Sequence, residues 1–181
     1  MNDIWFSSDF HFCHDKEFLY RPRGFESIIE HDEAIIANWN ELVKPDDEVY
    51  VLGDLMLNND IRGAECVRRL NGILHIVLGN HDTETRANKY CEFWNVESVK
   101  LAERKRWNGL NFFLCHYPTL CGNLDNDKPL KARVINLCGH AHTKYKFEDI
   151  NKGLIYHVEL DAHDNKPVAL DQIISDIRGV V

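Results

Sequence analysis

The fold of this chain is decided by residues 73–82, ILHIVLGNHD, in which an apolar run passes directly into a polar loop. The apolar half is typical of a buried strand, and loops at the carboxyl ends of such strands carry the functional groups of α/β proteins. In the loop, Gly79 provides a flexible backbone position, Asn80 an amide oxygen, His81 an imidazole that titrates near neutral pH and Asp82 a carboxylate. Taken alone, the loop also fits an ordinary surface turn rich in Asn and Gly. The rest of the sequence is needed to distinguish a functional loop from such a turn.

The same pattern, a short apolar run that ends in a polar residue, recurs elsewhere in the chain. The places are residues 4–6 before Asp9-Phe10-His11, 49–52 before Gly53-Asp54, 110–115 before His116, and 134–138 before Gly139-His140-Ala141-His142. Helical segments separate the first three runs of the chain, which predicts parallel strands with right-handed crossovers and with their carboxyl ends at one edge of a sheet. In an extended backbone, residues two apart such as Asp9 and His11 also project to the same side. We therefore expect these polar side chains to converge.

Local signals predict the remaining elements. Ser27 and Glu30 form a capping-box pattern ahead of apolar residues at helical spacing, which predicts a helix that ends near Val43. The other expected elements are helices at residues 59–70, 85–91 and 170–177, strands at 96–99 and 155–160, and hairpin turns at Asn108-Gly109 and Asn151-Lys152-Gly153.

Length and composition favour one cytoplasmic domain. A chain of 181 residues, 44% of them hydrophobic, can bury a sizeable core, so we expect a single domain over residues 1–181. The 29 acidic and 21 basic residues give a formal charge of -8, which disfavours binding to long nucleic acid or to an anionic membrane. The six cysteines have no paired spacing, which indicates reduced thiols. We expect no signal peptide, and no apolar run is long enough to cross a bilayer.

The polar residues at the strand ends are of the types that bind metal ions. They are carboxylates, an amide and imidazoles: Asp9, His11, Asp54, Asn80, His116, His140 and His142. Seven ligands suit two ions better than one, and mixed oxygen and imidazole donors fit manganese, iron, zinc or nickel better than calcium. Without metal, burying these groups together would carry a heavy desolvation penalty. We therefore expect two divalent metal ions, with manganese favoured.

The chain resembles the calcineurin-like metallophosphoesterase superfamily in five blocks that occur in the family's order, Asp9-x-His11, Gly53-Asp54, Gly79-Asn80-His81-Asp82, His116 and Gly139-His140-x-His142. More narrowly, residues 6–14, Arg21-Pro22 and Trp39-Asn40 resemble a subgroup of small bacterial and phage phosphoesterases, which commonly has Gly where Cys13 stands. The resemblance implies a four-layer α/β sandwich of two mixed sheets flanked by helices.

The resemblance also implies how the ligands divide between two metals. Asp9, His11 and His142 would hold one metal, Asn80, His116 and His140 the other, and Asp54 would bridge them. A site of this kind hydrolyses phosphate mono- or diesters, with nucleotides among the candidate substrates, by attack of a hydroxide that bridges the metals.

His81 is the expected general acid that protonates the leaving group, and Asp82 is expected to orient it and to raise its pKa. His14, Arg21 and Arg23 belong to a cationic loop near the same rim and are candidates for substrate binding, with a plain surface or ion-pair role as the alternative. The competing function is a non-catalytic metal-binding scaffold on the same fold, which has no need to keep the His81 acid.

Overall fold

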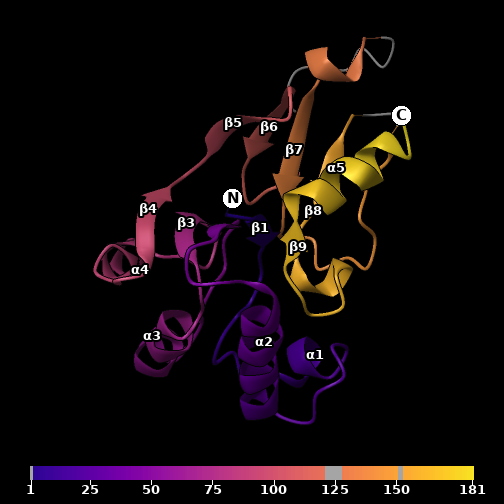
Figure 1. Cartoon of the computed structure of the whole chain (residues 1–181). Coiled ribbons are helices and arrows are strands. Elements are labelled where there is room, and N and C mark those ends of the chain that lie inside the picture. The colour runs from indigo at the N-terminus through magenta and orange to yellow at the C-terminus, as the bar shows by residue number, and fades with distance from the viewer. Residues whose placement is uncertain (1, 121–127, 151–152) are drawn as a thin grey trace.

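A computed structural model of the chain describes residues 2–120, 128–150 and 153–181 (Figure 1). Its strands are β1 Ile4–Ser7, β2 Glu48–Val51, β3 Ile73–Val77, β4 Val96–Lys100, β5 Glu103–Trp107, β6 Leu110–Leu114, β7 Val134–Cys138, β8 Ile155–His157 and β9 Val168–Ala169. Its helices are α1 Glu17–Tyr20, α2 Ile28–Leu42, α3 Asp60–Arg68, α4 Glu84–Tyr90 and α5 Leu170–Arg178, with short 3-10 helices at η1 Leu130–Ala132 and η3 Leu160–Ala162. None of the helices in this described part of the chain combines the length and apolar character needed to span a bilayer.

The first sheet has the strand order β4-β3-β2-β1-β9. Strands β1 to β4 are parallel neighbours, whereas β9 pairs with β1 in the antiparallel sense, so the sheet is mixed. Helices connect β1 to β2 and β2 to β3, as the alternation in the sequence predicts. The carboxyl ends of β1, β2 and β3 therefore lie at one edge, where the chain continues into Asp9, Asp54 and Asn80.

The second sheet has the order β5-β6-β7-β8. The predicted hairpin joins β5 to β6 through Asn108 and Gly109, whose φ angles of 49° and 79° are those of a left-handed two-residue turn. Strands β6, β7 and β8 are parallel, so β6 and β7 deliver His116 and His140 at the same edge of this sheet. The predicted α/β architecture of two mixed sheets with flanking helices is confirmed.

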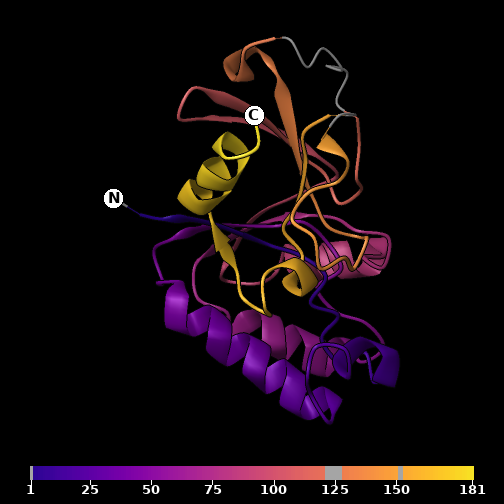
Figure 2. The same cartoon turned by 90° about the vertical axis from the view of Figure 1, so that its right-hand side faces the viewer.

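Two apolar clusters hold these layers together. One joins α2 and α3 to the first sheet, with Trp39 and Ile76 among its buried residues. The other fills the space between the two sheets, with Phe6 and Tyr156 among its residues, and α5 contributes Ile173 to it. Figure 2 shows α2 and α3 beneath the first sheet and α5, in yellow, on the opposite side of that sheet. The strand ends that carry the polar loops are thus fixed by a core on both faces of the first sheet.

The local signals at α2 and β8 are confirmed with two differences. Ser27 Oγ accepts a hydrogen bond from the Glu30 amide at 3.2 Å, but the Glu30 carboxylate accepts its hydrogen bond from the Glu26 amide, at 2.8 Å. Around the second predicted hairpin, the His157 amide donates to the Lys146 carbonyl at 2.9 Å, while residues 151–152 of its turn lie outside the described residues. The strand expected over residues 155–160 ends at His157, because the chain beyond it bridges to the loop after β1.

Candidate metal centre

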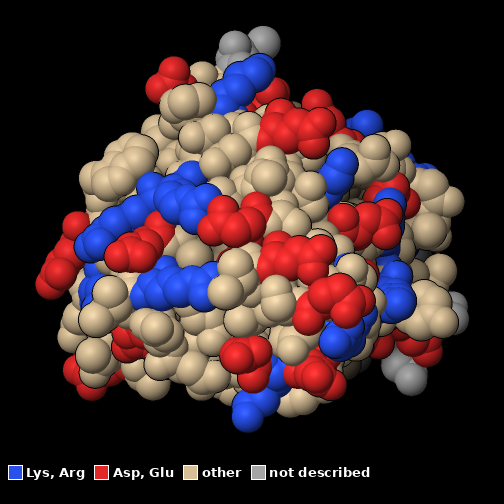
Figure 3. All heavy atoms as spheres, turned by 90° about the horizontal axis from the view of Figure 1, so that it is seen from below, with Lys and Arg blue, Asp and Glu red and all other residues tan. Residues whose placement is uncertain are grey.

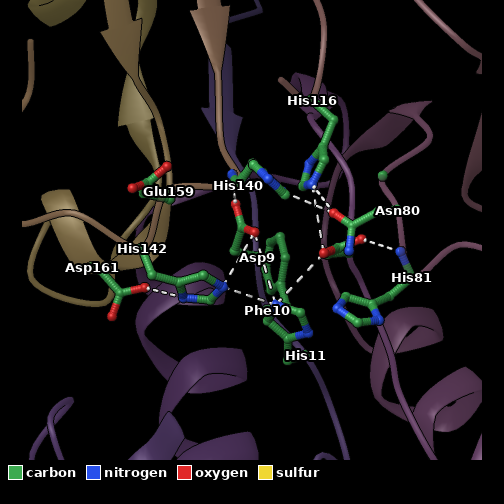
Figure 4. A network of polar contacts seen from close by, with 12 residues as sticks. Asp9, Phe10, His11, Asn80, His81, His116, His140, His142, Glu159 and Asp161 are labelled. Atoms are coloured by element: carbon green, nitrogen blue, oxygen red, sulfur yellow. Dashed lines mark hydrogen bonds and ion pairs between the residues drawn. The ribbon is translucent and has the colours of Figure 1, made fainter. Parts of the chain in front are cut away.

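The polar residues at the strand ends converge where the two sheets meet (Figure 4). Backbone hydrogen bonds hold the loop after β1 beside the loop after β2: the Asp9 amide donates to the Gly53 carbonyl at 3.0 Å, and the His11 amide donates to the Asp54 carbonyl at 2.9 Å. These bonds continue the parallel pairing of β1 and β2 beyond the strands. The side chains of both loops are therefore placed by the sheet itself.

Asp9, His11 and His142 form the first group of the site. Their ligand atoms all lie within 4.8 Å of one another. His142 Nε2 lies 3.1 Å from His11 Nε2 and 3.5 Å from Asp9 Oδ1. Asp9 and His11 are almost fully buried, whereas the side chain of His142 is 38% exposed, so this group opens to solvent on the His142 side.

Asn80, His116 and His140 form the second group. Asn80 Oδ1 lies 3.0 Å from His116 Nε2 and 2.9 Å from His140 Nδ1. Because His116 Nδ1 donates to the Leu52 carbonyl at 2.7 Å, a neutral His116 presents the lone pair of Nε2 to the site. Two acceptor atoms then face each other across 3.0 Å, an arrangement that a cation between them would stabilise.

Asp54 lies between the two groups. Its Oδ2 is 3.7 Å from His11 Nε2 and 3.5 Å from His116 Nε2. Its Oδ1 accepts a hydrogen bond from the His81 amide at 2.9 Å. One carboxylate oxygen of Asp54 therefore faces both groups, and the other is held by the backbone of the loop after β3.

The backbone at these residues is not extended, contrary to the expectation for Asp9 and His11. Asp9, His11, Asp54, His140 and His142 all adopt left-handed conformations, with φ of 59°, 50°, 56°, 74° and 48°. Non-glycine residues in this region cost of order 1 kcal/mol or more each, and such strain concentrates at functional sites. The side chains converge because the chain turns sharply at each of these residues while hydrogen bonds tie the turns to the neighbouring strand.

Two glycines leave the space that the carboxylates occupy. A Cβ at Gly79 would lie 2.2 Å from Asp54 Oδ1, and a Cβ at Gly139 would lie 2.1 Å from Asp9 Oδ2. Real atoms do not approach so closely, so only glycine fits at either position. The glycines in the GNHD and GHAH segments thus serve the packing of the site.

The donor set fits divalent metal ions. Asp9 Oδ1 is buried and has no hydrogen-bond partner within the described part of the chain, and a cation bound beside it would satisfy this oxygen. Burial, together with the charges of His142 and Arg23, lowers the pKa of His11 to about 2, which keeps its imidazole neutral and able to coordinate. Burial, with smaller contributions from the charges of Asp9 and Asp82, also raises the pKa of Asp54 to about 6, so without a metal the charged carboxylate is disfavoured here.

His81 and Asp82 have different surroundings. The His81 ring lies edge-on to the His11 ring, with 5.4 Å between centroids, and it lines a cavity beside the first group. Asp82 Oδ2 accepts hydrogen bonds from the Asp54 amide at 2.7 Å and the Gly79 amide at 2.9 Å, and Oδ1 accepts one from the Tyr90 hydroxyl at 2.7 Å. These contacts assign Asp82 to holding the loops together, whereas its expected contact with the His81 ring stays a prediction.

Arg23 lies behind the site and not at its rim. The side chain is 1% exposed and forms an ion pair with Asp161 at 2.6 Å, and its other bonds include one to the Asp9 carbonyl at 2.8 Å. Asp161 Oδ2 in turn accepts a hydrogen bond from His142 Nδ1 at 3.0 Å. Burial opposes ionisation, but His142 and Arg23 outweigh it and hold the pKa of Asp161 well below its usual range. Arg23 therefore supports the ligands, and we propose no substrate contact for it.

The other two substrate candidates occupy the rim. Arg21 is half-exposed and pairs with the carboxylate of Glu26, which directs its guanidinium along the surface. The His14 ring lies 5.7 Å from the His11 ring and 5.6 Å from the Phe18 ring, between centroids, and burial lowers the pKa of His14. Of the three candidates, His14 is the one that lines the cavity beside the metal ligands.

Cys13 stands where the small phosphoesterases that the sequence resembles commonly have glycine, and its backbone conformation suits glycine. Its φ of 67° lies in the left-handed region that glycine adopts without strain. The thiol does not add a group to the metal site: Cys13 is buried in the core cluster with Cys66, and its amide donates to Asp32 Oδ2 at 3.1 Å.

Several residues of the site could not be assigned from the sequence. Asp161 follows the end of β8, and this position alone does not assign it a role. Tyr90 lies inside a helical segment, where nothing in the sequence marks it as part of a site. Phe18, Leu19 and Pro22 line a cavity of about 480 Å³ together with His11, His14, His81, His142 and Asp161. The four-residue helix α1, which carries two of these apolar residues, is too short to be predicted from periodicity.

Comparison with known proteins identifies the family. A model of the calcineurin-like phosphoesterase superfamily domain matches residues 3–158. An uncharacterized protein of Methanocaldococcus jannaschii is 32% identical over 98% of this chain and 93% of its own length. Among solved structures, a protein of unknown function from Aquifex aeolicus has a TM-score of 0.69 at 18% identity and covers 98% of this chain and 100% of that one. A novel archaeal phosphodiesterase has a TM-score of 0.52 at 18% identity and covers 89% of this chain and 86% of that one. The order of the strand-end residues, the two mixed sheets and the match over residues 3–158 lead to one conclusion: the chain belongs to the calcineurin-like phosphoesterase superfamily.

Proposed function

We propose that this protein hydrolyses phosphate mono- or diesters at a centre of two divalent metal ions. The observation that carries the proposal is the position of Asp54, whose Oδ2 faces His11 of the first group and His116 of the second. A single carboxylate between two sets of mixed oxygen and imidazole donors is suited to two neighbouring ions. Membership of a phosphoesterase superfamily supports the same activity.

Each ligand would have a defined part in such a centre. The first ion would be held by Asp9, His11 and His142, the second by Asn80, His116 and His140, and Asp54 would serve both. When bound, the ions supply Lewis-acid activation of water and neutralise charge on the phosphate. The chain contributes positioning, because backbone hydrogen bonds tie the loop of Asp9 and His11 to the loop of Asp54.

His81 is the proposed general acid. Its amide is fixed to Asp54 Oδ1, and its ring borders the cavity next to His11, so it would stand beside a phosphate bound in the cavity without being a metal ligand. From that position a protonated ring can donate to the leaving alkoxide as the bond to phosphorus breaks. Asp82 would act through the backbone of this loop, since it binds the amides of Gly79 and Asp54.

The activity is tested by loading the purified protein separately with manganese, iron, zinc, nickel or magnesium. Each form is assayed on a nitrophenyl monoester, a nitrophenyl diester and a panel of linear and cyclic nucleotides, and bound metal is counted in parallel. We expect two metal ions per chain and metal-dependent hydrolysis. Two bound ions without turnover of any ester would instead support the scaffold function, and a folded protein that binds no metal would overturn the site itself.

The role of His81 is tested by comparing leaving groups. His81→Ala and the polar variant His81→Gln should reduce kcat by about 10²- to 10⁴-fold on alkyl esters, whose alkoxide leaves poorly without a proton. Nitrophenyl esters need little protonation and should lose much less, which makes them the internal control. Equal losses on both kinds of ester would assign His81 to phosphate binding and exclude it as the acid.

A further inference from the structure

The cavity beside the metal ligands has two unlike walls. One wall carries ligands of the first group and the proposed acid, His81. Phe18, Leu19 and Pro22 form an apolar wall of the same cavity, which His14 and Asp161 also line. At about 480 Å³ the cavity falls in the size range of sites for small organic molecules and is much larger than a phosphate group requires. A substrate that filled it would therefore extend beyond its phosphate group and reach the apolar wall.

Phe18 lies at this cavity next to a residue that is packed in the protein interior. Its side chain is 72% exposed, whereas the next residue, Leu19, is 5% exposed and packs with Tyr20 and Ile28. The ring of Phe18 meets the His14 ring at an interplanar angle of 84°, so His14 does not stack on it, and the 72% exposure of Phe18 leaves aromatic surface open to a ligand. An exposed aromatic face beside a catalytic centre is suited to stack on a planar ring.

Among the described residues, Lys16 carries a positive charge near His14, whereas neither arginine of the loop lines the cavity. The two arginines of the loop are engaged elsewhere, Arg21 with Glu26 at the surface and Arg23 with Asp161 in the interior. Because Leu19 and Pro22 line the cavity together with Phe18, the part of the substrate that reaches Phe18 is matched by apolar and aromatic contacts. Phe18 is also separated from the ligand His11 by two successive ring contacts of 5.7 and 5.6 Å, so a group that reaches it extends well beyond the phosphate.

We propose that the cavity binds a nucleoside leaving group, with its base stacked on Phe18 and its sugar beside His14. This inference rests on the proposed function, because it names the group that His81 would protonate. A base satisfies both requirements of the wall: it is planar, and the sugar places it at a distance from the phosphate. Stacking on an aromatic side chain tolerates any base, so the site would select nucleotides as a class.

Equilibrium binding tests the inference without turnover. The metal-loaded protein is titrated with non-hydrolysable phosphonate analogues of AMP and of ribose 5-phosphate, which differ only in the base. We expect the AMP analogue to bind about tenfold or more tightly than the ribose analogue. Phe18→Ala should remove most of this preference, and Phe18→Trp should retain it. Trp94→Ala is the matched control, because Trp94 is 77% exposed and precedes β4, at the opposite end of the strands from the site.

Three results would overturn the inference. The first is equal binding of the two analogues by the unmodified protein, and the second is an equal loss of both in Phe18→Ala. The third is a Phe18 dependence as strong for phenylphosphonate as for the AMP analogue, which would replace the nucleoside by a simple aryl group. The two proposals fail separately: a base preference that depends on Phe18 without hydrolysis of any ester counts against the enzyme, and hydrolysis without that preference counts against the pocket.

Discussion

At the scale of single residues, the metal ligands depend on neighbours that set their orientation. His142 Nδ1 donates to Asp161 at 3.0 Å, so in the neutral ring it is Nε2 that carries the lone pair, and this atom faces Asp9 and His11. Arg23 fixes Asp161 from behind through bonds of 3.0 and 2.6 Å. Carboxylates that hold a ligating histidine in this way raise its basicity and fix its ring. We therefore propose that Asp161 positions His142 for the first of the two proposed metal ions.

The Asp161→Asn variant tests this role, since it keeps the shape of the side chain and removes the charge. We expect manganese affinity, measured by calorimetric titration, to fall about 10- to 100-fold. Asp164→Asn, at an exposed position three residues away, should leave the affinity unchanged. Thermal unfolding of both variants without metal separates this effect from a loss of folding. Unchanged affinity in Asp161→Asn would show that the His142 ring is held by other contacts.

Gly139 sets the space for Asp9. In Gly139→Ala, the new Cβ would lie 2.1 Å from Asp9 Oδ2 and 2.2 Å from Ser8 Oγ, so the Asp9 carboxylate has to move. A ligand displaced by about 1 Å is expected to cost roughly 100-fold in kcat. Gly109→Ala is the control, because a Cβ there meets nothing within 4 Å and only the left-handed turn is strained. Metal-dependent hydrolysis and manganese affinity should fall in the first variant and not in the second.

At the scale of elements, the features that could be predicted from the sequence are those that follow from hydrophobic periodicity and from the order of strands and helices. The strands that end at Asp9, Asp54 and Asn80 were predictable because helices alternate with them, which forces parallel pairing and a common edge. The left-handed turns at His140 and His142 were not predictable, because nothing in their residue types departs from an ordinary loop. They form because the tertiary hydrogen bonds and the fit of the carboxylates outweigh local preference.

Asp47 joins two elements of the first sheet. Its carboxylate accepts hydrogen bonds from the Asp3 amide at 3.0 Å and the Trp5 indole at 3.1 Å on the β1 side, and from the Lys44 amide at 2.9 Å in the turn before β2. Burial disfavours the charge, but the hydrogen bonds from Lys44, Asp3 and Trp5 outweigh it and lower the pKa of Asp47. The folded protein therefore binds this proton less tightly than the unfolded chain does.

The expected consequence is a loss of stability in acid that depends on Asp47. The contribution is complete above the unfolded pKa of about 4 and disappears as pH falls below it. At pH 7, Asp47→Asn should lower the free energy of unfolding by about 2 kcal/mol. The difference between variant and unmodified protein should shrink from pH 5 to pH 3 in urea unfolding. The exposed neighbour serves as control, since Asp46→Asn should give little difference at either pH. A difference for Asp47→Asn that does not change with pH would contradict the argument.

At the scale of the whole molecule, charge is spread without a long basic surface on the face seen in Figure 3. Lys and Arg side chains there form short patches interrupted by Asp and Glu, among the described residues drawn. The formal charge of -8 adds a general repulsion of polyanions. Two bound divalent ions would halve that charge and would make the cleft locally positive, which favours a small anionic ester over a long nucleic acid.

The same ions should decide the stability of the whole chain. Asp9 and Asp54 are 0% and 2% exposed, and two buried carboxylates side by side cost free energy until cations bind. Ligands that bind only the folded state stabilise it by about 2.7 kcal/mol at 100 times their dissociation constant, which corresponds to a rise in Tm of about 5–10 °C for a chain of this size. We expect this rise on adding manganese and its loss on adding a chelator.

Asp54→Asn should have opposite effects on two quantities: it should keep or raise the Tm without metal, and it should reduce the rise in Tm that manganese causes. Without metal the variant loses a buried charge and should have a Tm equal to or above that of the unmodified protein. With manganese it lacks the carboxylate oxygen that lies 3.7 Å from His11 Nε2 and 3.5 Å from His116 Nε2, so its Tm should rise much less. The exposed variant Asp46→Asn should respond to manganese as the unmodified protein does. An Asp54→Asn protein that is destabilised without metal and gains the full rise with manganese would show that Asp54 serves the fold, and would remove it from the metal centre.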